Sequence, residues 1–149
     1  DFLTVTDKHI DADNQSCVGT ATADFDNNGF PDIFVANRVD VINEGGSKLY
    51  KNIGNSNSLL KIKLVGRSSN RFGVGAKIQV TNGILTQTKL VTAGNSFFSQ
   101  SSFEKIFGFG SYKGRVDITV YWPSGIVQQL NNIKLNKRIV IKEYMPIQV

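Results

Sequence analysis

The chain has 149 residues, 40% of them hydrophobic, and a formal net charge of +5, which is typical of one or two folded domains rather than a disordered segment. No apolar run approaches the roughly eighteen residues of a transmembrane helix, so no membrane span is expected, and no basic and then apolar leader opens the sequence. The single cysteine, Cys17, excludes an internal disulfide, and the start at Asp1 suggests a processed or excised piece.

Charge divides the chain into two predicted units. Residues 1–58 carry nine acidic and four basic residues, a formal charge of −5. Residues 59–149 carry thirteen basic and three acidic residues, a formal charge of +10, and the two values sum to +5. The small polar stretch KNIGNSNS, residues 51–58, has nothing to bury and is typical of a linker. We therefore predict two domains, residues 1–58 and 59–149.

The first unit contains a dense group of oxygen donors in DFDNNGFPD, residues 24–32. Carboxylate and amide side chains alternate along this stretch, a glycine permits a sharp turn, and a backbone carbonyl and a last carboxylate can complete a ring of oxygens. The predicted ligands are Asp24, Asp26, Asn28, the carbonyl of Phe30, and Asp32. Oxygen ligands favour Ca²⁺ over zinc or copper, and a cation would relieve the repulsion between the carboxylates.

The loop is not an EF-hand, because that motif needs a glutamate at its twelfth position, where this chain has Val35 in a strand-like run. The alternative is an acidic turn that binds nothing, since Asp, Asn and Gly are also common turn residues. The alternating spacing and the terminal Asp32 favour the metal interpretation.

The second unit is predicted to be an antiparallel β-sandwich-like domain. Five stretches alternate apolar with polar residues and are rich in β-branched side chains, namely residues 59–65, 76–80, 85–91, 115–122 and 138–143. Gly, Asn and Ser between them are typical of tight turns. No stretch has the pattern of an amphipathic helix, and QQLNNI, residues 128–133, is expected to form a single turn at most. The predicted fold class is all-β.

Several motifs resemble known families. In the first unit, GTATADFDNNGFPDIFVANR and SKLYKN resemble a repeat of the FG-GAP or VCBS type, the blade of calcium-binding β-propellers. The rest of the chain resembles the ASPIC and UnbV domain, through NRFGVGAKIQV (70–80), GNSFFSQSSFEKIFGFG (94–110) and VDITVYWPSGIVQQL (116–130). The motifs follow that family in order and approximate spacing, and together they cover nearly the whole chain.

The resemblance implies a single propeller-blade-like antiparallel unit with a Ca²⁺ loop, followed by an ASPIC and UnbV-like β domain. The ligands of the repeat fall on the same five residues, with Asn28 at a position where the family most often has Asp, so this site carries one charge fewer. The resemblance also implies a secreted or cell-surface domain that is not an enzyme and is often linked to adhesion or matrix contact.

The residues themselves also offer no catalytic arrangement. The single histidine, His9, lies in a polar acidic segment without a nucleophile-elbow sequence, and the three acids of the basic half are scattered. The basic half carries no recognised nucleic-acid-binding signature, so its lysines are interpreted as a solvated sheet face. We predict that the protein is not an enzyme.

Glycan binding stays open as a second class of function. Phe97 and Phe98 belong to a cluster of five phenylalanines that would stack on sugars, although core packing is the commoner role of large aromatic residues. Lys61 and Lys63 are expected on outward strand faces, where a polysaccharide or an acidic protein would meet them. Asn14 begins a formal N-glycosylation sequence, which matters only if the protein is secreted through an endoplasmic reticulum.

One blade cannot bury both faces of its sheet, because repeat units take their stability from neighbours. The chain is therefore part of a longer propeller protein, or the blade packs on its own sheet domain, or subunits complete one another's sheets. We favour the last two. We expect a calcium-stabilised extracellular structural or adhesion module that associates with other proteins or with itself, in a filament or larger surface assembly.

Overall fold

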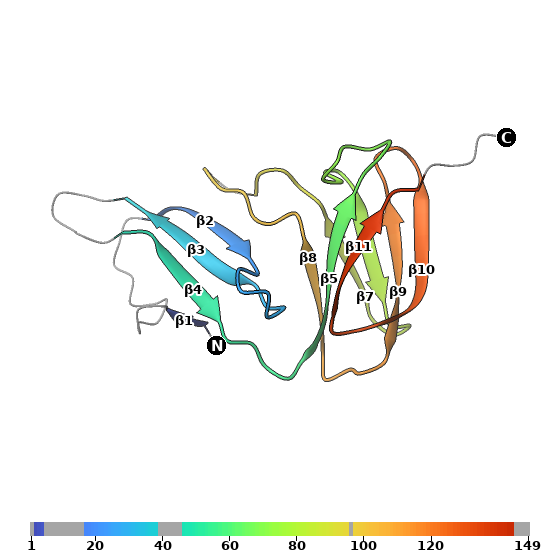
Figure 1. The fold of residues 1–149 in the computed structure, drawn as a ribbon, viewed down its shortest axis with the longest axis horizontal. Helices are drawn as coiled ribbons and strands as arrows, with labels where there is room; N and C mark the ends of the chain where they lie inside the picture. The colour runs from blue at the N-terminus through green and yellow to red at the C-terminus, as the bar shows by residue number, and fades with distance from the viewer. Residues whose placement is uncertain (1, 5–16, 39–45, 96, 145–149) are drawn as a thin grey trace. The chain divides into compact units, whose positions relative to one another are not determined.

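The computed structural model describes residues 2–4, 17–38, 46–95 and 97–144, which form strands joined by turns and loops (Figure 1). His9 and the predicted glycosylation site at Asn14 lie outside these residues. The all-β prediction is confirmed. No helix in the described part of the chain has the length and apolar character needed to cross a membrane.

Contacts divide the chain into two compact units. The first comprises Asp1–Asn55 and Gly94–Ser102, and the second comprises Ser56–Ala93 and Phe103–Val149. The division predicted from charge placed residues 94–102 in the second domain, whereas their contacts group them with the first unit.

The first unit contains a four-stranded antiparallel sheet in the order β1-β4-β3-β2. Its strands are β1 (Phe2–Thr4), β2 (Cys17–Ala23), β3 (Asp32–Asn37) and β4 (Lys48–Asn52). Among its described residues, only two hydrophobic side chains, Val35 and Tyr50, are buried. The sheet therefore has a small core of its own.

Residues 94–102 bond to the outer edge of β2. The backbone N–H of Ser102 donates to the carbonyl of Thr22 at 2.9 Å. The hydroxyl oxygens of Ser99 and Ser101 accept from the backbone N–H groups of Thr20 and Thr22, at 2.9 and 3.1 Å. The serine hydroxyls thus form hydrogen bonds with backbone N–H groups of β2 that would otherwise be able to pair with another chain.

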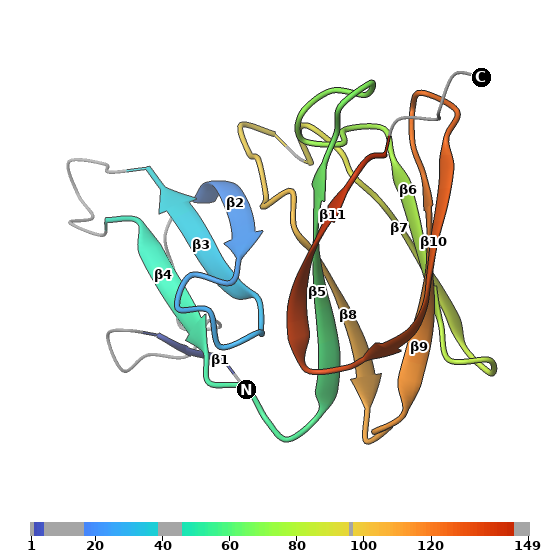
Figure 2. The same cartoon turned by 45° about the vertical axis from the view of Figure 1, so that its right-hand side comes forward.

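The second unit is a sandwich of two sheets (Figure 2). One sheet has the order β10-β9-β6-β7, and the other has the order β11-β5-β8. The strands are β5 (Ser58–Val65), β6 (Lys77–Thr81), β7 (Thr86–Leu90), β8 (Lys105–Gly110), β9 (Arg115–Tyr121), β10 (Val127–Lys134) and β11 (Lys137–Lys142). Buried side chains from both sheets, including Leu60, Ile62, Phe107, Ile78 and Ile118, form one hydrophobic cluster. The predicted sandwich-like character is confirmed.

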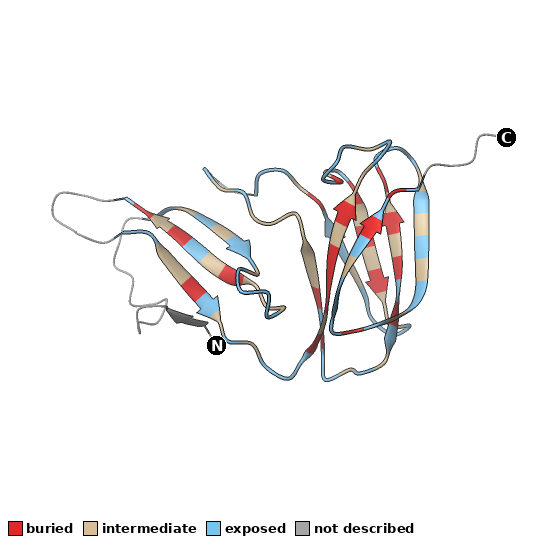
Figure 3. Ribbon diagram, in the orientation of Figure 1, coloured by how far each residue is buried: buried red, intermediate tan, exposed pale blue. Residues whose placement is uncertain are grey.

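The alternation seen in the sequence matches the burial of β5, β6 and β9 (Figure 3), whereas on β7 Leu90 is exposed. On β9, Val116, Ile118 and Val120 are buried and the residues between them are not. The same period along β5 and β6 places their apolar residues in the core. Each predicted strand of the second unit thus corresponds to an observed one, within one residue at most ends.

Three features of this sandwich differ from the sequence-based expectation. β11 pairs with β5 in parallel, so the three-stranded sheet is mixed. In β8, the buried residues Phe107 and Phe109 alternate with exposed glycines. Because glycine is uncommon inside strands, the sequence pattern did not predict this strand. Residues 128–133, expected to form a turn at most, lie in β10, where a bulge between Leu130 and Ile133 interrupts the alternation.

A buried carboxylate ties the end of β11 to two loops. Glu143 is 1% exposed and accepts hydrogen bonds from the backbone N–H groups of Arg67 and Ser69, at 2.7 and 2.8 Å. The hydroxyl groups of Ser69 and Ser124 donate to its other oxygen. Burial by itself would raise the pKa of Glu143, but the hydrogen bonds outweigh burial and lower the pKa from 4.5 to about 2.

We expect Glu143→Gln to lower the free energy of unfolding by roughly 2 kcal/mol near neutral pH, because a neutral amide cannot replace the charge-assisted hydrogen bonds. The folded pKa lies below the unfolded value, so Glu143 contributes stability above pH 4.5 that is lost as the pH falls towards 2. Urea unfolding of both proteins across this range measures the effect. The gap between them should shrink with acidification, and a gap that is constant with pH would contradict the assignment.

Candidate metal centre

The loop between β2 and β3, residues 24–31, folds around two residues with left-handed backbone. Asn27 has φ of 60° and Gly29 has φ of 95°. Asparagine and glycine are the residues that best tolerate this conformation. These two residues thus permit the sharp turn that brings the acidic side chains of the loop towards one another.

Two of the carboxylates hold the loop through backbone N–H groups. Oδ2 of Asp24 accepts from the N–H of Gly29 at 3.0 Å. Asp32, which is 2% exposed, accepts from the N–H of Phe25 through Oδ2 and from the N–H of Asn52 through Oδ1, both at 2.8 Å. Asp32 therefore joins the start of the loop to the end of β4.

Three of the predicted ligands converge. Asp24, Asp26 and Asp32 each offer one carboxylate oxygen, and these oxygens lie within 4.8 Å of one another. Two oxygens that bind one Ca²⁺ at about 2.4 Å can be separated by at most about 4.8 Å. The separation and the all-oxygen donor set therefore fit Ca²⁺.

Asn28 and Phe30 are placed in the same loop, with different surroundings. Oδ1 of Asn28 accepts from the N–H of Phe30 at 2.8 Å, and Nδ2 donates to Oδ2 of Asp26 at 3.2 Å and to the carbonyl of Asn52 at 2.7 Å. A carbonyl oxygen has a second lone pair, so Asn28 retains the capacity to bind a metal. The ring of Phe30 packs against Gly54, 2.7 Å from where a Cβ on that residue would lie. The role of the Phe30 backbone carbonyl as a ligand stays a prediction.

Lys51 on β4 is a counter-charge that the sequence interpretation missed. Its Nζ lies 2.7 Å from Oδ2 of Asp26. The hydrogen bond from Lys51 is the main cause of a lowered pKa at Asp26, and the same bond raises the pKa of Lys51. Three carboxylates and one ammonium leave a formal charge of −2 in the loop region.

Lys51 and Asn52 carried only a weak signal in the sequence. They stand at the end of SKLYKN, which resembles part of a repeat, and the whole of β3 separates them from the acidic loop along the chain. Antiparallel pairing of β3 with β4 returns the chain to the loop and brings them there. Pairing register, rather than local pattern, decides this contact.

The residues predicted for glycan or partner contact do not share one environment. Phe97 and Phe98 are 74% and 84% exposed, with ring centroids 4.1 Å apart, whereas Phe107 and Phe109 of the same cluster are buried. The expectation that Lys61 is exposed on a strand face is corrected: it is 6% exposed. Its Nζ lies 3.4 Å from Oε2 of Glu104, which also pairs with Arg138.

Lys63 is half-buried on the same strand. Lys61 is held by the sheet rather than presented to solvent, so the two lysines do not form an exposed basic row. The predicted glycan surface therefore retains its exposed aromatic pair but loses one of its two lysines.

These observations define an all-β protein with a carboxylate-lined loop in one unit and a two-sheet sandwich in the other. Residues 66–145, more than half of the chain, match the family described as ASPIC and UnbV, and the protein belongs to this family. The resemblance of the second unit is thereby confirmed. The comparison with curated proteins found no match.

We expect Lys51→Met to increase the affinity of the loop for Ca²⁺ by about twofold to tenfold, because the variant removes a cation that competes for Asp26. In chelator the same variant should melt slightly lower than wild type, since the carboxylates lose their counter-charge. Lys142→Met, which removes an exposed lysine of the second unit, is the control. Calcium titration by calorimetry measures the change, and an affinity equal to that of the control would contradict the role of Lys51.

Proposed function

We propose that this protein is a calcium-stabilised structural or adhesion module that works outside the cytoplasm and carries no catalytic activity. The observation that supports it most directly is the convergence of carboxylate oxygens of Asp24, Asp26 and Asp32 to within 4.8 Å of one another, with Lys51 paired to Asp26. A divalent cation would balance the remaining formal charge of −2.

The FG-GAP or VCBS relationship of the first unit is part of this proposal. An acidic loop between two antiparallel strands of a four-stranded sheet is the arrangement that such a blade requires. Asp24, Asp26 and Asp32 would hold the ion, with Asn28 and the carbonyl of Phe30 completing the set. Bound Ca²⁺ would supply a cross-link between the end of β2 and the start of β3.

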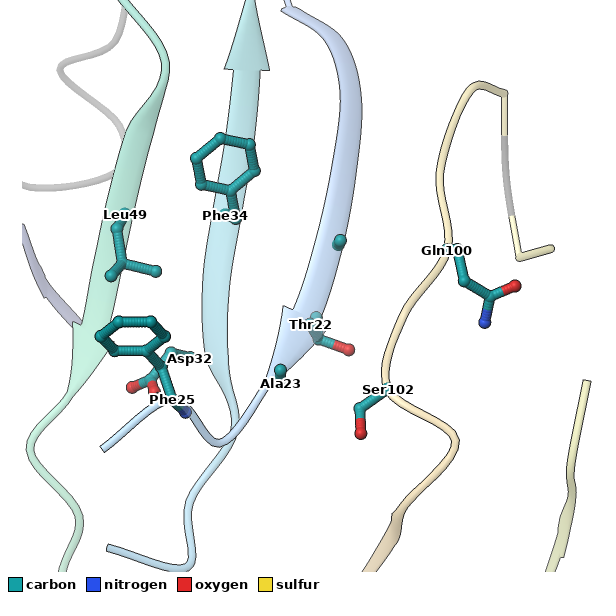
Figure 4. Close-up of a pocket in the computed structure, with 9 residues that line it drawn as sticks. Thr22, Ala23, Phe25, Asp32, Phe34, Leu49, Gln100 and Ser102 are labelled. Atoms are coloured by element: carbon teal, nitrogen blue, oxygen red, sulfur yellow. Dashed lines mark hydrogen bonds between the residues drawn. The ribbon is translucent and has the colours of Figure 1, made fainter. Parts of the chain in front are cut away.

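An apolar pocket supports association with another protein surface. The pocket, of about 340 Å³, lies within the first unit, and Figure 4 shows Phe25, Phe34 and Leu49 together on one side of it. Phe25 is 74% exposed and Phe34 is 44% exposed. An exposed apolar sheet face beside a small core is typical of a surface that a partner or a second copy covers.

Glycan binding is the second candidate, and the exposed aromatic pair Phe97 and Phe98 favours it. Phe98 also has a left-handed backbone, with φ of 52°, which is unusual for a bulky residue. Binding to a polysaccharide that persists in high salt and is lost in Phe97→Ala would support this candidate, because stacking is less sensitive to salt than charge pairing.

We expect Ca²⁺ to raise the thermal stability of the protein, because a ligand that binds only the folded state adds about 2.7 kcal/mol at a hundredfold excess over Kd. Millimolar concentrations are needed if the affinity is that of many extracellular modules, roughly 10⁻⁴–10⁻³ M. Melting curves in calcium and in chelator measure the shift.

Asp26→Asn should remove most of this calcium-dependent shift, because it deletes a convergent carboxylate without changing shape. Asp117→Asn, in β9 of the second unit, is the matched control and should keep the full shift even if its overall stability falls. Coincident melting curves of wild type in calcium and in chelator would refute the calcium proposal.

We expect the protein to self-associate or to join a larger assembly, and Phe34→Ser should weaken this association by removing an exposed aromatic ring from the pocket. Sedimentation across a concentration series, at low and moderate salt, measures it. Ile84→Ser, which replaces a side chain that is 95% exposed in the second unit, is the control. A compact monomer of the isolated chain at every concentration would refute self-association.

A further inference from the structure

A second pocket, of about 600 Å³, lies at one end of the sandwich in the second unit. The start of β5, the turn before β9 and the turn between β10 and β11 supply its walls. The residues that bear on its chemistry are Ser58, Tyr112, Lys113, Arg115, Lys134 and Asn136. All of them belong to the second unit, whereas the acidic loop belongs to the first.

The lining of this pocket is positively charged. Lys113, Arg115 and Lys134 supply three cations, and no carboxylate is among the lining residues. The nearest acid along β9, Asp117, uses Oδ1 to accept from the backbone N–H of Asn132. Like charges gathered without a counter-charge favour the binding of an anion.

Two of these cations, Lys113 and Arg115, are held by hydrogen bonds to backbone carbonyls and retain further N–H donors. Nζ of Lys113 donates to the carbonyl of Ser56 at 2.8 Å, and Nη1 of Arg115 donates to the carbonyl of Asn132 at 2.7 Å. An ammonium has three N–H donors and a guanidinium has five, so each retains N–H groups that can reach a ligand.

Ser58 is the independent sign of a ligand. It is 1% exposed, and its Oγ has no hydrogen-bond partner among the described residues. A buried hydroxyl without a partner is rare in folded proteins, because losing its hydrogen bond to water costs free energy. An oxygen of a bound anion would accept from this hydroxyl.

We propose that this pocket binds an oxyanion, phosphate or sulfate, either free or carried on a sugar. The anion accepts charge-assisted hydrogen bonds from Lys113, Arg115 and Lys134 and one hydrogen bond from Ser58. The volume lies in the range of pockets that hold small molecules, so a phosphorylated or sulfated sugar unit fits as well as a free ion.

The test is a titration of the whole chain with sodium sulfate and with sodium phosphate at constant ionic strength, followed by the NMR shifts of the Lys113, Gly114 and Asn136 amides. Phosphate is titrated in chelator to avoid calcium phosphate. Dextran sulfate and neutral dextran form the second arm, which distinguishes an anion carried on a sugar from a free one. Tighter binding of dextran sulfate than of sulfate would assign the sugar-borne source.

Ser58→Ala should weaken sulfate binding about tenfold, because it removes a hydrogen bond to a charged group, and should leave the melting temperature without anion unchanged or higher. Lys134→Gln should weaken binding by a similar factor, whereas the charge-matched control Lys142→Gln should not. Equal affinity in Ser58→Ala and wild type, or equal losses in both lysine variants, would overturn the proposal. Saturation by chloride at the same ionic strength would also overturn it.

Discussion

Repulsion between carboxylates is the constraint around which the first unit is organised. Asp24, Asp26 and Asp32 are brought together by a loop whose own backbone N–H groups supply part of the compensation, and Lys51 supplies one opposing charge. Among the described residues of this unit, only two hydrophobic side chains, Val35 and Tyr50, are buried, so the hydrophobic contribution of these residues is small. Its stability is consequently sensitive to the charge balance of the loop, in a way that a well-packed domain is not. Asp32 matters most, because its hydrogen bonds link the loop with β4.

The second unit is stabilised by different interactions, namely an apolar core and hydrogen bonds to a buried carboxylate. Its two sheets enclose one continuous apolar cluster, and its buried carboxylate, Glu143, accepts hydrogen bonds from N–H and O–H donors of described residues. Hydrogen bonding to the charged form, rather than an ion pair, keeps that group ionised. These donors belong to the loops that pack against the end of β11, so the carboxylate of Glu143 is compensated by the fold of this unit itself. Calcium dependence, if it is measured, is therefore expected to report on the first unit alone.

Much of this architecture could be predicted from the sequence. Alternation along 115–122 gave a strand with Val116, Ile118 and Val120 inwards, because a half-buried strand has a period of two. The convergence of the acidic residues also followed from their local spacing. Contacts that depend on pairing between strands far apart in the sequence could not be predicted. Lys51 reaches Asp26 because β4 pairs with β3, and Lys61 is buried on β5, which lies between β11 and β8. β10 was missed because its bulge breaks the alternation.

The family match and the contact-based units do not have the same boundaries, and the difference has a physical cause. Residues 66–145 match the ASPIC and UnbV family, yet within that range Gly94–Ser102 belongs by contact to the first unit. Ser99, Ser101 and Ser102 bond the edge of β2, so a cut at residue 58 would leave that edge without these partners. An exposed edge invites pairing with other chains. The residues that match the family therefore include a segment whose serines form hydrogen bonds with the edge strand of the first unit.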